Sequence, residues 1–178
     1  PGWWTSHREP GGIQTKTAVE QARKQVAELL GCHSDEIIFT SGGSESNNMA
    51  IQGVAFEKRD EGNHIITSQI EHPAVYDICG SLASTGFEVT SLPVDTDGLI
   101  DIEELQRSIT KRTTLITIMH ANNEVGTIQP IDEITRIAAQ HGIVVHTDAA
   151  QSAGKIPVRV DDLGVHLLSI AGHKLYAP

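Results

Sequence analysis

The sequence predicts an α/β domain with a mostly parallel sheet, and two observations carry that prediction. Short runs rich in Val, Ile and Thr alternate along the chain with longer segments whose apolar residues recur near helical spacing. Polar loops rich in Gly and Asn separate these runs. Strands that alternate with helices are typical of a sheet whose strands run parallel.

Five segments are predicted to be helices. Residues 15–30 place apolar side chains near helical spacing with charges opposite, and Gly31 is expected to end that helix. Asp101 is the expected N-cap of a later helix, with Glu104 at its third position. The predicted helices are residues 15–30, a segment that opens within 41–48 and runs to about 58, 74–84, 101–108 and 131–141.

The predicted strands are short and bounded by turn residues. Residues 113–119 are rich in β-branched side chains, and residues 143–147 form a buried-type apolar run. A turn is expected at residues 95–98. The predicted strands are residues 36–40, 64–67, 87–92, 113–119, 143–147 and 165–170.

Composition excludes several classes of partner. The 178 residues suffice for one domain, and 23 acidic against 13 basic residues give a net charge of −10. This charge argues against nucleic acid or an anionic membrane as the main partner. No apolar run is long enough for a transmembrane helix. Cys32 and Cys79 make no disulfide framework and lie in no metal-binding motif, so we expect no metal site and a reducing compartment, the cytoplasm or an organelle.

Both ends of the sequence indicate a piece of a longer chain. The first residues lack an initiating Met and are rich in Gly and Pro up to Gly12, and the last residue, Pro178, stands just past a lysine-containing loop. We expect residues 1–14 to be irregular and residues 15–178 to form one domain that is incomplete.

Two residues at the predicted carboxyl edge of the sheet carry unusual chemistry. Asp148 follows the strand at 143–147, where α/β sheets place their ligands, and small residues behind it let a flat molecule approach the backbone. An Asp that only caps the next helix is the alternative. Lys174, after Gly-His and another apolar run, is a candidate Schiff-base lysine, with an ordinary surface lysine as the alternative.

Three further loops add groups that bind a ligand. Gly43 and Ser44 open a helix whose free N–H groups would cradle a phosphate, although such a turn is often only a cap. His72 precedes a Pro and could stack on a flat ring, or be a solvated loop histidine. Asn122 and Asn123 suit a tight turn, or an amide that holds a phenolic or carboxylate oxygen. Together with an acid and an amine, these groups are what pyridoxal 5′-phosphate requires.

The sequence resembles the cysteine desulfurases and the related selenocysteine lyases, which are class V, fold-type I pyridoxal-phosphate enzymes. The resemblance covers nearly all of the chain from residue 15 onward and implies a three-layer α/β/α fold, the large cofactor-binding domain of such enzymes, truncated at both ends. Five motifs carry it, in the family's order: FTSGGSESNN (39–48), EH (71–72), NNEVG (122–126), HTDAAQ (146–151) and GHKLYAP (172–178).

The resemblance implies which residues hold the cofactor phosphate. Gly43 and Ser44 would bind it, with Ser44 standing where the family usually has Thr, and His173 would help. Many cysteine desulfurases carry a phosphate-binding Ser at the position of Ala171, so one contact is weakened here. An apolar residue at this position is similar to the selenocysteine lyases.

The resemblance also implies the residues around the cofactor ring. His72 would stack on the ring and relay protons, and Asn123 would contact the ring oxygen or the substrate carboxylate. Asp148 would pair with the ring nitrogen and Gln151 with the phenolic oxygen. Lys174 would form the Schiff base with the cofactor and move protons during catalysis.

The implied activity is removal of sulfur from L-cysteine, leaving alanine and an enzyme persulfide for a sulfur acceptor such as an iron–sulfur scaffold protein. Relatives are homodimers, and their catalytic cysteine and substrate-binding arginine come after the lysine. We therefore expect both beyond Pro178, give neither Cys32 nor Cys79 that role, and expect no turnover by the 178 residues alone. The alternatives are a selenocysteine lyase, another class V enzyme such as a transaminase or kynureninase relative, and a non-catalytic, truncated cofactor-binding protein.

Overall fold

The computed structural model describes residues 10–175, and side chains from residue 14 onward. The chain forms two compact units, Pro1–Phe39 and Thr40–Pro178, and each is described by itself.

The first unit contains one long helix and a short turn. Helix α1 runs over Pro10–Leu30 and ends at Gly31, whose φ of 71° is the left-handed conformation expected of a helix-ending glycine. The helix begins five residues before its predicted start, so residues 10–14 are helical rather than irregular, while residues 1–9 lie outside the described part. A 3₁₀ turn, η1, follows at Ser34–Glu36.

The strand predicted at residues 36–40 is wrong. Residues 37–40 are assigned to no strand, and the Ile37 carbonyl accepts a hydrogen bond from the Arg23 guanidinium instead of from a neighbouring strand. The same guanidinium lies 4.9 Å from the ring centre of Phe39. Ile38 is 65% exposed. A run of strand-forming residues becomes a strand only where another backbone offers its hydrogen bonds.

The second unit is built on a five-stranded sheet in the order β2-β1-β3-β4-β5, with every neighbouring pair parallel. The parallel sheet predicted from the alternating pattern is confirmed. Strand β1 is one residue longer than predicted, β4 is shifted by one residue, and the other three strands are shorter than predicted. The strands are β1 His64–Ser68, β2 Glu88–Leu92, β3 Thr113–Thr117, β4 Val144–Asp148 and β5 Leu167–Ser169.

The helices of this unit occupy the predicted segments. The Asp101 side chain caps α4 by accepting from the Glu103 N–H at 2.8 Å, as predicted. Within residues 10–175, no helix has the length and apolarity needed to cross a membrane. Two short elements, α6 and η2, were not predicted, because a single turn is too short to show a helical period. The elements are α2 Gly43–Glu57, α3 Pro73–Ser84, α4 Ile102–Ser108, α5 Ile131–Gln140, α6 Val160–Leu163 and η2 Gly172–Leu175.

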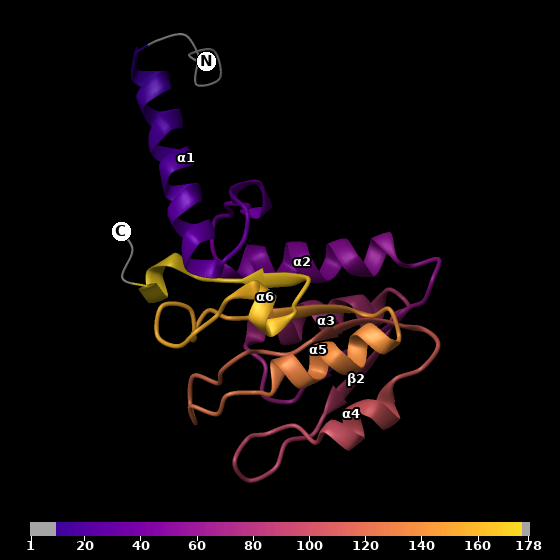
Figure 1. Ribbon diagram of the computed structural model, residues 1–178. Helices are drawn as coiled ribbons and strands as arrows, with labels where there is room; N and C mark the ends of the chain where they lie inside the picture. The colour runs from indigo at the N-terminus through magenta and orange to yellow at the C-terminus, as the bar shows by residue number, and fades with distance from the viewer. Residues whose placement is uncertain (1–9, 176–178) are drawn as a thin grey trace. The chain divides into compact units, whose positions relative to one another are not determined.

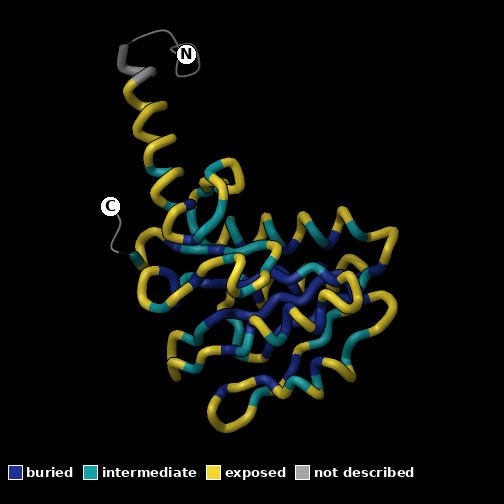
Figure 2. The backbone as a smooth tube through the Cα atoms, in the orientation of Figure 1, coloured by how far each residue is buried: buried dark blue, intermediate teal, exposed yellow. Residues whose placement is uncertain are grey.

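The sheet lies between two layers of helices (Figure 1). Successive strand residues point to opposite faces, so Ile65 joins a buried cluster with α2 and α3, whereas Ile66 joins one with α4 and α5. Leu115 and Ile116 divide in the same way. Figure 2 shows the central strands as the most buried part of the unit. The predicted three-layer α/β/α architecture is therefore confirmed.

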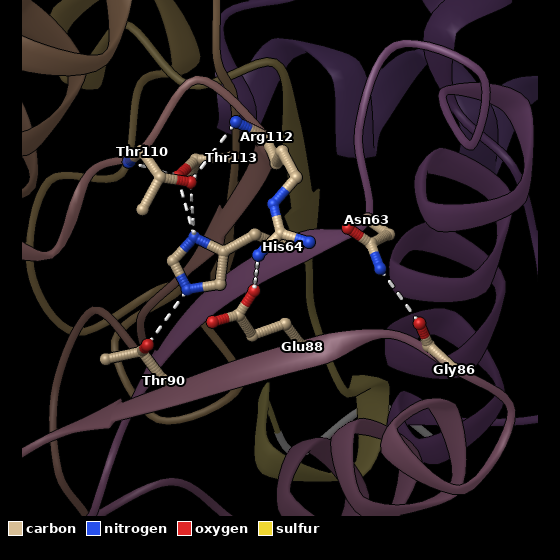
Figure 3. Close-up of polar contacts among 8 residues, drawn as sticks. All are labelled: Asn63, His64, Gly86, Glu88, Thr90, Thr110, Arg112 and Thr113. Carbon is tan, nitrogen blue, oxygen red and sulfur yellow. Dashed lines mark hydrogen bonds and ion pairs between the residues drawn. The ribbon is translucent and has the colours of Figure 1, made fainter.

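At the amino ends of the strands, the buried side chain of His64 on β1 forms hydrogen bonds to threonines on β2 and β3 (Figure 3). His64 Nδ1 lies 2.7 Å from Thr113 Oγ1, and Nε2 lies 2.9 Å from Thr90 Oγ1. An ion pair between Arg112 and Glu88 stands beside it. Burial lowers the pKa of His64, Arg112 lowers it further and Glu88 opposes both, so the ring is neutral at pH 7.

The buried His64 makes the free energy of unfolding depend on pH. The folded-state pKa of His64 lies below its ordinary value of 6.5, so its contribution is full above pH 6.5 and is lost as the pH falls below it. We expect His64→Gln to lower the free energy of unfolding by about 1–3 kcal/mol at pH 7.5 and to lose less stability than the wild type between pH 7.5 and 5. Urea unfolding at both values measures this. The exposed His141→Gln is the control, and equal pH dependence in wild type and His64→Gln would contradict the account.

Candidate active site

The predicted site residues lie where the parallel strands end. His72 follows β1, Asn123 follows β3, Asp148 is the last residue of β4, and Lys174 follows β5. Parallel strands present their carboxyl ends at one edge of the sheet, which is where open α/β sheets bind ligands. Residues that are far apart in sequence are thus collected along one edge.

Asp148 is buried, with 6% of its surface exposed, and is held by two donors. Asn47 Nδ2 donates to Oδ2 at 2.7 Å, and the Ala150 N–H donates to Oδ1 at 2.9 Å. A carboxylate can accept about four hydrogen bonds, so both oxygens keep capacity for a ligand N–H. Asp148 does not cap a helix, because the residues that follow it form turns, and its only cap-like contact within the described residues is the bond from the Ala150 N–H.

Asn47 is a site residue to which the sequence reasoning gave no role. It lies on α2, four residues after Gly43, is 2% exposed, and orients the Asp148 carboxylate. Its own Oδ1 is buried and has no hydrogen-bond partner among the described residues. A signal was present in the sequence, since asparagine favours caps and turns over helix interiors and two adjacent asparagines stand here inside a predicted helix.

The start of α2 has the features of a phosphate cradle. Gly42 caps the helix without a side-chain hydrogen bond, which leaves backbone N–H groups at the positive end of the helix dipole. A Cβ added to Gly43 would lie 3.3 Å from the Ala171 Cβ, so the helix start and the loop after β5 are in close contact. Ser44 and His72 line one pocket of about 400 Å³.

Glu45 folds back over this loop. Its carboxylate accepts from the Ser41 N–H, and the hydrogen bonds with Ser41 lower the pKa of Glu45. One N–H that precedes the helix is thereby satisfied, whereas those of the first turn remain available to a ligand.

Gly43→Val should interfere with this cradle. Its side chain would press on Ala171 and cover the helix start, so we expect at least a roughly tenfold loss in pyridoxal-phosphate affinity, about 1.4 kcal/mol. Gly53→Val is the matched control, because a Cβ there meets nothing within 4 Å. Titration of each variant with the cofactor, followed by absorbance, measures the dissociation constants. An unchanged affinity in Gly43→Val would contradict the assignment.

His72 is both an exposed side chain and the N-cap of α3. Its Nδ1 accepts from the Ala74 N–H at 3.1 Å, so in the neutral ring the proton is on Nε2. Pro73 at the first helical position fixes the turn. The imidazole is therefore held by the helix it caps, while the ring borders the pocket that also contains Ser44.

The two asparagines after β3 divide their tasks. Asn122 holds the turn, since its Oδ1 accepts from the Glu124 and Val125 N–H groups and its Nδ2 donates to the Ile70 carbonyl. Asn123 is exposed and, within residues 10–175, has no side-chain hydrogen bond. It is thus the asparagine that remains available, and its cofactor role stays a prediction.

The remaining predicted residues lie after β4 and β5. Gln151 is half-buried, and its Oε1 lies 3.5 Å from Lys155 Nζ. His173 and Lys174 are exposed on η2, and the Lys174 N–H donates to the Ala171 carbonyl at 2.9 Å. The turn thereby starts beside the residue that contacts Gly43. The roles of these three side chains toward a cofactor stay predictions.

A buried hydrogen-bonded relay beneath the site was not predicted. Ser46 on α2 donates to Ser169 Oγ at 2.9 Å, Ser169 lies 3.0 Å from His146 Nε2, and Thr117 lies 2.8 Å from His146 Nδ1. Burial lowers the pKa of His146 to about 4, so the ring is neutral and both nitrogens are satisfied. The relay fixes the first turn of α2 against β3, β4 and β5.

No group of three or more His, Cys, Asp or Glu residues in the described part of the chain is arranged to hold a metal ion.

Comparison with known proteins identifies what this chain is similar to. The family model described as "Aminotransferase class-V" matches residues 5–178. A curated relative from Dictyoglomus turgidum named cysteine desulfurase IscS is 57% identical over 94% of the chain. A relative from Dictyostelium discoideum named probable cysteine desulfurase, mitochondrial, is 50% identical over the same share.

A solved structure named "SspA in complex with cysteine" superimposes on 94% of the chain with a TM-score of 0.90 and 48% identity. The chain spans 42% and 37% of the two curated relatives and 48% of this solved chain. Each of these three matches is thus to less than half of a longer protein.

Proposed function

We propose that this chain, which belongs to the class V aminotransferase family, is the cofactor-binding part of a pyridoxal-phosphate-dependent cysteine desulfurase. Class V aminotransferases and cysteine desulfurases depend on that cofactor. The observation that carries the proposal is the buried Asp148, which accepts a hydrogen bond from Asn47 and lies at the carboxyl edge of the sheet. Lys174 follows strand β5 at the same edge. The high identity to proteins named cysteine desulfurase supports the choice of substrate.

The residues present fit pyridoxal phosphate. The glycine-opened start of α2 suits its phosphate, the buried carboxylate of Asp148 suits a protonated ring nitrogen, and His72 borders the pocket with Ser44. Asn123, Gln151 and His173 are assigned the ring oxygens and the phosphate by the resemblance. When bound, the cofactor supplies an electron sink for charge that develops at the substrate α-carbon.

Four residues of this chain then have defined tasks. Asp148 keeps a proton on the ring nitrogen, and Asn47 keeps the carboxylate aimed. Lys174 Nζ supplies the amine that holds the cofactor and later takes the α-proton of the substrate. His72, with its proton on Nε2, covers the ring and passes a proton.

The overall reaction transfers one sulfur atom. L-Cysteine and an enzyme thiol give L-alanine and an enzyme persulfide: the carbon–sulfur bond breaks, a sulfur–sulfur bond forms, and a proton takes the place of sulfur on the β-carbon. Cys79 is unsuited as the accepting thiol, because burial raises its pKa to about 12 and only the thiolate is nucleophilic.

The proposal extends to the whole protein and its partners. Residues 15–178 are assigned to the large domain, which contains the sheet unit. A homodimer and a sulfur acceptor such as an iron–sulfur scaffold protein are proposed from the resemblance. A reducing compartment, cytoplasmic or organellar, is consistent with two cysteines that form no disulfide and with a relative named mitochondrial.

Product analysis tests this function. The whole protein should release alanine from L-cysteine in a cofactor-dependent way and gain one sulfur atom by mass, whereas the 178 residues alone should show no turnover. Selenocysteine lyase, the alternative that Ala171 suggested, is not favoured, because the relatives are named cysteine desulfurase. Alanine from selenocysteine with none from cysteine would favour that alternative, and cofactor binding without either product would overturn both.

A further inference from the structure

Glu71, the residue before His72, has an environment unusual for a carboxyl group. Its Oε1 accepts two hydrogen bonds, from Ser68 Oγ at 2.7 Å and from the Met119 N–H at 2.8 Å. Its Oε2 is shielded from solvent and has no hydrogen-bond partner among the described residues. The proposed function gives Glu71 no task.

The contacts of Glu71 join two loops of the site. Met119 precedes the loop that carries Asn123, and Glu71 precedes His72. A second bond runs alongside in the same direction, because Asn122 Nδ2 donates to the Ile70 carbonyl at 3.2 Å. The turn after β1 and the loop after β3 are thus fastened at two points, one of which is the Glu71 side chain.

We propose that Glu71 is a positioning residue of the active site, held as a neutral carboxylic acid that fastens the His72 turn to the end of strand β3. This rests on the proposed function, because that function gives the fastening a purpose: it holds the turn that carries His72 in a fixed place against the end of the strand that leads to Asn123.

The hydrogen-bond pattern indicates the neutral form. Both donors reach the same oxygen, as they would for a carbonyl oxygen. The other oxygen, Oε2, has no partner among the described residues, and a buried, unpaired charge costs more free energy than a buried, unpaired hydroxyl group. Burial raises the pKa of Glu71 to about 8, the two hydrogen bonds oppose this rise, and the charge of Asp148 adds to it. A neutral Glu71 also avoids a second negative charge near Asp148.

The titratable groups that interact with Glu71 from the packed elements are Asp148, on β4, and the Cys79 thiol, on α3. From β1 and the end of β3 it receives the Ser68 hydroxyl and the Met119 N–H. Cys79 is neutral, since its own pKa is raised to about 12. Titration of Glu71 is therefore separable from that of Cys79.

Two substitutions test whether Glu71 positions the site through its hydrogen bonds as a neutral acid, or only packs against its neighbours. Glu71→Gln keeps the accepting oxygen and is neutral at every pH, whereas Glu71→Ala removes the fastening. We expect Glu71→Gln to bind pyridoxal phosphate within about threefold of the wild type, and Glu71→Ala to bind it at least about tenfold more weakly. Glu124→Gln, an exposed glutamate in the neighbouring loop, is the control.

A second readout needs no cofactor. A carboxyl group with a raised folded-state pKa stabilises the fold fully below its ordinary pKa of 4.5 and loses that contribution as the pH rises through about 8. The stability of Glu71→Gln relative to the wild type should therefore rise between pH 5 and 9. The infrared spectrum of the wild type at pH 6 should contain a protonated-carboxyl band that Glu71→Gln lacks.

These outcomes separate the two claims. A band and a pH-dependent stability difference without any cofactor binding would leave Glu71 neutral but overturn the proposed function and its positioning role. Cofactor binding with no band and a pH-independent difference would overturn the neutral acid while leaving the proposed function intact. Equal cofactor affinities for Glu71→Ala and the wild type would overturn the positioning role.

Discussion

Lys174→Ala in the whole protein is expected to lower alanine formation from L-cysteine by about 10³-fold or more, because it removes both the amine that holds the cofactor and the base that takes the α-proton. The side chain is exposed on η2 and has no ion-pair partner within the described residues, so its removal should leave the unfolding midpoint nearly unchanged. Steady-state kinetics and thermal unfolding of the same preparation measure both effects.

Lys155→Ala is the matched control, since Lys155 is also exposed and lies near the same sheet edge, after β4. We expect its rate to stay within about twofold of the wild type. Adding a small primary amine should restore part of the activity of Lys174→Ala but not change that of Lys155→Ala. Full activity in Lys174→Ala would remove the basis of the proposed mechanism.

Asp148→Asn is expected to have the second-largest effect, a fall in rate of about 10²–10³-fold, of the order reported for loss of a single electrostatic contact in a buried site. The amide keeps the shape of the side chain but carries no charge to hold the proton on the ring nitrogen. The rate with saturating cofactor and substrate measures this loss.

Asp148→Asn should not lower the stability of the fold, although it lowers the rate. Asp148 is 6% exposed, and removing a buried charge relieves its desolvation cost, so the free energy of unfolding should stay equal or increase. Asp161→Asn, on the exposed helix α6, is the control. A variant that unfolds at lower denaturant and loses activity in proportion would indicate a structural role for Asp148 instead.

Much of the fold followed from the sequence because its elements obey a period. The isoleucines of β1 and β3 alternate between the two helix layers, and α5 has a clear apolar face, so type and order were predictable. The failure at residues 36–40 has a physical cause. Ile37, Ile38 and Phe39 favour extended backbone, but strand formation depends on a partner strand that local sequence does not reveal.

The site was predictable where single residue types carry the chemistry, as at Asp148 and Lys174. It was not predictable where a residue acts through another. Asn47, His146 and Glu71 all stood inside the recognised motifs, yet their tasks follow from bonds to residues 23 to 101 positions away in sequence. Such pairings are created by the order of the strands, and no local pattern encodes them.

The most direct test of the central claim is to identify the residue that carries the cofactor. The purified protein is incubated with pyridoxal phosphate, reduced with borohydride, digested and mapped by mass spectrometry, with Lys174→Ala treated in parallel. The account predicts a single major adduct on the peptide containing Lys174 and none in the variant. An adduct spread over several exposed lysines, or one that persists in Lys174→Ala, would contradict it.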